Sequence, residues 1–174
     1  MTQAVAGVAI AVFVLTAAWC DATTHRIPNK IPVAGLAVAL ILRAPLGVDS
    51  MTQGLAGFGL AFLVSGALYA LRGIGAGDVK LLAGVGAFLG SSQVMGALGL
   101  IAVLGMAFAL LSVIRKGVLL LLIFNTLDLV KSLLSLGRAG QIRKLGSPGA
   151  LTIPYGVPIA LGTLIWWFGK GVRL

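Results

Sequence analysis

Residues 4–20 read AVAGVAIAVFVLTAAWC, an apolar run without a charged residue, and Asp21 follows it at once. A helix needs about 20 apolar residues, within a range of about 17 to 25, to cross the hydrocarbon core of a bilayer. This run is therefore predicted to be a membrane-spanning helix. Comparable apolar runs are predicted as further spans at residues 31–47, 52–71, 78–90, 94–114 and 151–168. The run 78–90 is shorter and begins with charges, so it is either a short span or a half-embedded helix.

The composition of the chain also indicates a membrane protein. Of its 174 residues, 59% are hydrophobic and 10% are charged, whereas a soluble domain carries about a quarter charged residues. Such a chain cannot cover itself with polar groups, so lipid is expected to surround it. The 25 glycines agree with this interpretation, because small residues let membrane helices approach closely. Gly86 and Gly90 form one such small-xxx-small pair.

The positions of the basic residues predict the orientation. Lys and Arg collect in cytoplasmic loops, so the net charge of +9 is attributed to these loops and not to nucleic-acid binding. About six spans with the N-terminus outside place most of them in the cytoplasm. The basic residues left on the other side are Arg43, Lys170 and Arg173. Arg43 lies near the end of the predicted span 31–47 and is expected to extend its side chain toward the membrane surface.

Residues 117–136 are apolar enough to span, but they also carry a polar face. Within about 120° of arc, at about 100° per residue, the helix would present a set of polar residues: Asn125, Asp128, Lys131, Ser132 and Ser135. An amphipathic helix lying in the membrane interface is therefore favoured over a span. The predicted fold is all-α, a single polytopic membrane domain of residues 1–174 with about six spans and this interfacial helix.

Two aspartates are the candidate catalytic residues. The predicted topology places Asp21 at the end of the first span and Asp78 at the start of the fourth, on the cytoplasmic side. Ionisable groups at membrane depth are costly and usually functional. Two carboxylates that meet share one proton, so one can activate water while the other protonates a leaving amide nitrogen.

Other hydrolytic mechanisms lack the residues they need. His25 is the single histidine and Cys20 the single cysteine, so no His/Cys cluster offers a metal site, and His25 is interpreted as a solvated loop residue and not as the base of a Ser/His/Asp triad. An aspartyl dyad without metal or cofactor is thus the hydrolytic mechanism that this sequence supplies. A small transporter that moves protons or cations on the same two aspartates is the alternative.

The sequence around each aspartate is distinctive. Residues 73–86 read GIGAGDVKLLAGVG and place Gly75 and Gly77 just before Asp78, which is expected to open a helix where free N–H groups favour a negative charge. Residues 21–30 read DATTHRIPNK, and Pro28 is expected to end the first helix. The simpler roles are a helix-capping acid for Asp78 and a loop acid for Asp21.

These motifs together resemble those of the type IV prepilin peptidases. The matching features are D-x(4)-R-I-P-N from Asp21, G-x-G-D-x-K around Asp78, and IPYGVPIALG at residues 153–162. The resemblance implies that Asp21 and Asp78 are the catalytic pair, and that Gly75 and Gly77 form the active-site loop.

The same resemblance implies a substrate and a location. The family removes the leader peptides of prepilins and pseudopilins at the cytoplasmic face of the bacterial inner membrane. No CxxC segment is present, so the chain resembles the short, peptidase-only form of Flp or tight-adherence pili, and N-methylation is not assigned to it. Lys80, Arg26 and Asn29 are candidates for contacts with substrate. No metal, cofactor or nucleic acid is expected.

Overall fold

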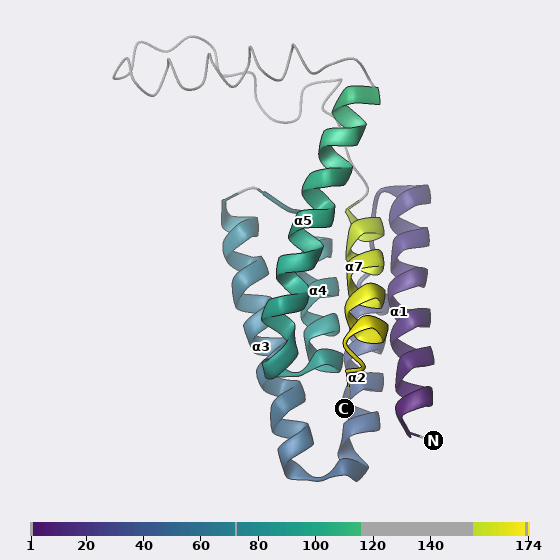
Figure 1. Cartoon of the computed structure of the whole chain (residues 1–174), viewed down its shortest axis with the longest axis vertical. Helices are drawn as coiled ribbons and strands as arrows, with labels where there is room; N and C mark the ends of the chain where they lie inside the picture. The colour runs from purple at the N-terminus through teal and green to yellow at the C-terminus, as the bar shows by residue number, and fades with distance from the viewer. Residues whose placement is uncertain (1, 72, 116–154, 173) are drawn as a thin grey trace, which may run out of the picture. The chain divides into compact units, whose positions relative to one another are not determined.

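The computed structural model describes residues 2–71, 73–115, 155–172 and 174, and every regular element in these ranges is helical. This confirms the all-α prediction for the described residues. The elements in chain order are α1 (Thr2–Thr24), α2 (Lys30–Arg43), a 3-10 turn (Ala44–Leu46), α3 (Val48–Ala70), α4 (Ala76–Leu89), α5 (Ser91–Arg115) and α7 (Gly156–Gly169) (Figure 1).

The chain forms two compact parts, which are described separately. The first comprises residues 1–106 and 154–174, and the second comprises residues 107–153. Of the second part, the structure describes only the last turns of α5. The predicted interfacial helix at 117–136 lies outside the described residues, and the single-domain prediction stays a prediction.

Three helices are long and apolar enough to cross a membrane, namely Gln3–Thr24, Val48–Ala70 and Ser91–Ser112. They correspond to the spans predicted at 4–20, 52–71 and 94–114. The helices α2, α4 and α7 have 14 residues each, or about 21 Å at 1.5 Å per residue. That is shorter than the ~30 Å hydrocarbon core. The protein is a multi-pass membrane protein, and the count of six spans stays a prediction.

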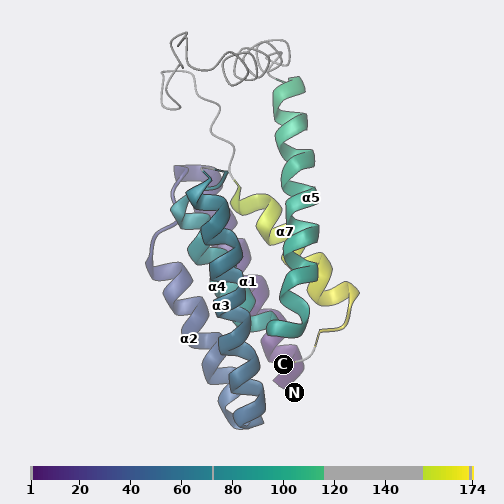
Figure 2. The same cartoon turned by 90° about the vertical axis from the view of Figure 1, so that its left-hand side faces the viewer.

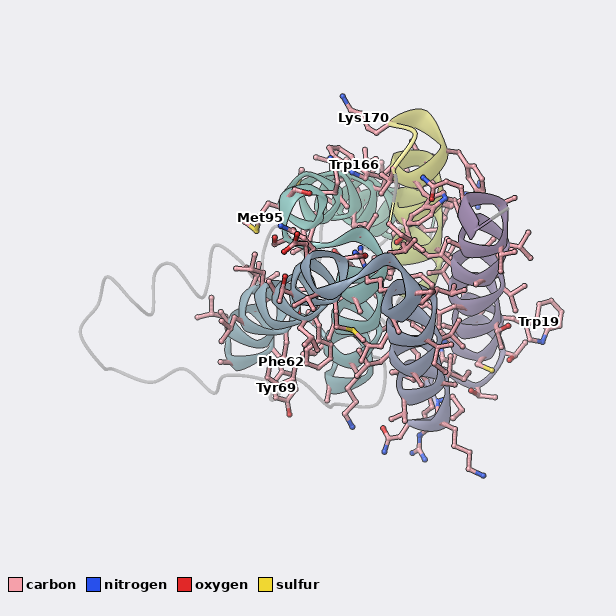
Figure 3. All side chains as sticks on the ribbon, turned by 90° about the horizontal axis from the view of Figure 1, so that it is seen from below. Trp19, Phe62, Tyr69, Met95, Trp166 and Lys170 are labelled. Atoms are coloured by element: carbon pink, nitrogen blue, oxygen red, sulfur yellow. The ribbon has the colours of Figure 1, made fainter. Side chains whose placement is uncertain are left out.

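Large apolar side chains point away from the helices over the outer surface of the first part. Trp19 is 72% exposed, and Phe62, Tyr69 and Met95 are also exposed; Figure 3 shows these four side chains projecting outward. In water such patches would drive association. In a bilayer they are solvated by lipid tails, so this surface is suited to contact lipid.

The helix α4 is central to the first part. It packs against α1, α2, α3 and α7, and every residue from Leu81 to Leu89 is buried. Gly86 lies directly against the backbone of Gly57 in α3, and a Cβ on Gly57 would stand 2.8 Å from the Cα of Gly90. Gly86 and Gly90 therefore allow close helix approach, as the sequence predicted.

Arg43 lies near the end of a predicted span, where its side chain was expected to reach toward the membrane surface. In the structure the side chain points the other way. Its side chain is 1% exposed, and its Nε and Nη2 donate to the carbonyl oxygens of Ala87 and Phe88 at 2.9 Å each. The reason is that the last carbonyls of α4 have no partner within the helix, and lipid offers none. Arg43 therefore points inward to these carbonyl groups.

The first helix extends one turn beyond its apolar run. α1 continues past Cys20 to Thr24 and ends before His25, which has a φ of 50°. The end precedes Pro28, as expected from the effect of proline on the preceding backbone. Asp21 is therefore a helical residue on the last turn of α1.

Candidate active site

Asp21 is a buried carboxylate that α7 holds in place. Its side chain is 8% exposed, and its Oδ2 accepts a hydrogen bond from the backbone N–H of Gly156 at 2.7 Å. Gly156 is the first residue of α7, so the carboxylate lies at a helix N-terminus, where a negative charge is favoured. A Cβ on Gly156 would stand 2.9 Å from the Cβ of Asp21, so glycine is what leaves room for this contact.

Asp78 is a second buried carboxylate, placed in the first turn of α4. Its side chain is 9% exposed, and its Oδ2 accepts a hydrogen bond from the N–H of Gly75 at 3.0 Å. Gly75 is the N-cap of α4, and an acid at the third helical position that reaches back to this N–H is half of a capping box. Asp78 therefore has the helix-capping role that the sequence offered as the simpler alternative, but the capping hydrogen bond uses only its Oδ2.

The two aspartates lie near each other at one end of the first part. Figures 1 and 2 show the end of α1 and the starts of α4 and α7 at the same upper end. The carboxylates of Asp21 and Asp78 lie within range of a Coulombic interaction, and the hydroxyl of Tyr155 lies within the same range of Asp78. The structure thus brings together the two acids that the sequence singled out, and Tyr155 lies near them.

The second oxygen of each carboxylate has no hydrogen-bond partner among the residues that the structure describes. Within the described residues, no hydrogen bond engages the Oδ1 of Asp21 or of Asp78. Backbone donors therefore hold the Oδ2 atoms, whereas no described residue holds the Oδ1 atoms.

The segment after Asp21 lies against the start of α4. The Nζ of Lys80 donates to Oδ1 of Asn29 at 2.8 Å, and Lys80 is exposed, whereas Asp78 is buried. A Cβ on Gly77 would stand 3.4 Å from the Cβ of Ile27. Arg26 is exposed and contributes its carbonyl to a hydrogen bond from Thr24 at 3.0 Å.

Two residues of the site received no role from the sequence. Tyr155 and Gly156 belong to the IPYGVPIALG motif, which was noted only as a resemblance. Their signal was a glycine at a helix start just ahead of Pro158, a residue type common in the first turn. Which side chain that glycine accommodates depends on the fold, because Asp21 is 135 positions away.

A cluster of metal ligands does not accompany the aspartates. In the ranges that the structure describes, no group of three or more His, Cys, Asp or Glu side chains could hold a metal ion. The site consists of two carboxylates, their backbone donors and the neighbouring Tyr155.

The model of the type IV leader peptidase family matches residues 8–110. This chain belongs to that family. The match covers well over half of the chain, includes both aspartates, and confirms the family resemblance stated from the motifs. No curated protein and no solved structure matches the chain. Membership makes the protein a peptidase, and α7 with Gly156 lies beyond the matched residues.

Proposed function

We propose that this protein is a membrane aspartyl endopeptidase that removes the cytoplasmic leader peptide from type IV prepilins or pseudopilins. One observation carries the proposal: two buried carboxylates, each held through Oδ2 by a backbone N–H, lie within range of a Coulombic interaction, and neither Oδ1 accepts a hydrogen bond from the described residues. Membership of a leader peptidase family supports the reaction class.

The proposed reaction uses the Oδ1 atoms of the two aspartates. One carboxylate takes a proton from a water molecule as the oxygen of that water attacks the scissile carbonyl carbon. The other, protonated, gives its proton to the amide nitrogen as the carbon–nitrogen bond breaks. Water is consumed, a new carboxyl and a new amine are formed, and the dyad returns to sharing one proton. No metal or cofactor takes part.

The placement of the dyad suits a substrate that remains partly in the bilayer. Both aspartates lie at helix ends beside the exposed segment that carries Arg26 and Lys30, and basic loops face the cytoplasm of the bacterial inner membrane. The apolar helix of a prepilin would stay in lipid, while its polar leader reaches this end of the protein.

The test is leader removal from a candidate prepilin co-expressed with the chain. We expect Asp21→Asn and Asp78→Asn each to abolish the faster-migrating, cleaved product on a gel. Asp49→Asn is the matched control, because Asp49 is exposed in the first turn of α3 and should leave cleavage unchanged. Wild-type processing by either of the first two variants would contradict the dyad. The transporter alternative has no support from the family.

A further inference from the structure

The helices α2 and α4 run in parallel and are joined at both ends. Both begin at the end of the bundle that carries the aspartates (Figure 2), and both have 14 residues. Near their starts, Lys80 of α4 donates to Asn29, the residue before α2, at 2.8 Å. At their other ends, Arg43 of α2 donates to the carbonyl oxygens of Ala87 and Phe88 in α4.

The guanidinium of Arg43 occupies a built site. Its Nη1 donates to the carbonyl oxygen of Ser50 at 2.9 Å and to the hydroxyl of Ser50 at 3.1 Å, so all three nitrogens are engaged. Two glycines make room for it, since a Cβ would stand 2.5 Å from its Cδ at Gly54 and 3.1 Å from its Nη2 at Gly90. One side chain therefore ties together α2, α3 and α4.

The atoms that Arg43 binds are those that α4 cannot satisfy alone. The last helical hydrogen bond runs from the N–H of Gly90 to the carbonyl of Gly86 at 2.9 Å, so the carbonyls of Ala87 and Phe88 follow without helical partners. A cation at a helix C-terminus also complements the helix dipole. Five donors in a rigid fork allow arginine to bind several acceptors at once, which lysine cannot do.

The interface between α3 and α4 is smooth where it is closest. The buried residues of α3 are Gly54, Gly57, Ala61 and Ser65. Small residues permit close approach, but they offer few side chains that would interlock against sliding along the helix axis. The directional hydrogen bonds of Arg43 oppose such sliding. A displacement of α4 along its axis would carry Asp78 with it.

We propose that Arg43 is a positioning residue that fixes α4 along its own axis and so holds Asp78 level with Asp21. It acts through α4, because its hydrogen bonds lie at the end of that helix opposite to Asp78. The kinetic part of the test rests on the proposed peptidase function, and the cross-linking part does not.

The kinetic test compares leader cleavage by Arg43→Met, Arg43→Lys and Lys170→Met in detergent. We expect Arg43→Met to lower kcat on the order of 100-fold, because a misplacement of about 1 Å in a catalytic group has an effect of that size. KM should stay within about twofold, since substrate contacts are unchanged. Arg43→Lys should fall between. Lys170→Met is the control, because this residue is exposed just after α7, with its ammonium over the ring of Trp166, and its loss should leave both constants unchanged.

The cross-linking test reports the position of α4 directly. In a Cys20→Ala background, the pair Ile27→Cys and Gly77→Cys should form a disulfide under mild oxidation, because the separation of 3.4 Å between their Cβ positions is near the range of disulfides. When Arg43→Met is added, most of this disulfide should fail to form in the time in which the parent pair becomes fully cross-linked. The readout needs no peptidase activity.

Four outcomes decide the proposal. Wild-type kcat in Arg43→Met, or a rise in KM with kcat unchanged, overturns it. If Arg43→Met yields no folded protein, Arg43→Lys replaces it in both assays, and parental cross-linking by folded Arg43→Lys overturns the proposal. If the parent cleaves no leader while Arg43→Met still loses the cross-link, the peptidase proposal fails and the positioning role stands.

Discussion

A single added methyl group on Gly156 tests how the site holds Asp21. The Cβ of Gly156→Ala would stand 2.9 Å from the Cβ of Asp21 and 3.0 Å from its Oδ2, whereas ordinary van der Waals contact begins at 3.4 Å. The φ of Gly156 is not positive, so alanine fits the backbone there. The substitution also keeps the N–H donor. Its effect should therefore come from displacement of the carboxylate alone.

The size of the effect follows from these distances. Relief of the contact requires a movement of about 0.5 to 1 Å if carbon atoms are to reach their preferred separation of about 3.5 to 4.0 Å. Because about 1 Å of misplacement can cost on the order of 100-fold in rate, we expect kcat to fall by roughly 10- to 100-fold. That corresponds to about 1.4 to 2.7 kcal/mol on the activation barrier.

The assay is leader cleavage by purified protein in detergent, with thermal unfolding measured on the same samples. Gly59→Ala and Gly99→Ala are the matched controls, because a Cβ at either helical glycine meets nothing within 4 Å. Both controls should cleave like the parent. The reasoning is refuted if folded Gly156→Ala cleaves at the parental rate, or if either control loses as much activity as Gly156→Ala.

Two further tests concern the surroundings of α4. Lys80→Met and Asn29→Ala should each lower the free energy of unfolding by less than about 1 kcal/mol, because the hydrogen bond between the two side chains is exposed. In thermal unfolding, the double variant should lose no more stability than either single variant. Additive losses would show that the two side chains do not interact. Gly86→Val should abolish folded protein on size exclusion, because its Cβ meets the backbone of Gly57, which cannot give way. The control Gly66→Val has open space at its Cβ, and equal losses in both would contradict the close contact.

The sequence predicted the helices well because lipid imposes a simple rule on them. A long uncharged run has to be helical in a bilayer, so α1, α3 and α5 followed from apolar length alone. Asp21 and Asp78 could be found because acids are scarce in this chain and are costly at membrane depth. Their motifs also indicated which helix ends would carry them.

The remaining features depend on contacts between distant segments. Arg43 was expected at the membrane surface, because the sequence does not reveal that α4 ends beside it with unsatisfied carbonyls. Gly156 was seen only as part of a motif, since its value lies in the space that it leaves for Asp21. Side-chain direction and helix adjacency decide both cases, and hydrophobic periodicity carries little information on either.

The hydrogen bond between Gly156 and Asp21 has a consequence for biosynthesis. Asp21 leaves the ribosome 135 residues before its backbone donor. A nascent chain whose first four helices have entered the membrane already contains both aspartates, yet the Oδ2 of Asp21 has no partner until α7 inserts. Assembly of the site is thus tied to translation of α7, and a product truncated before α7 would carry both acids without a completed site.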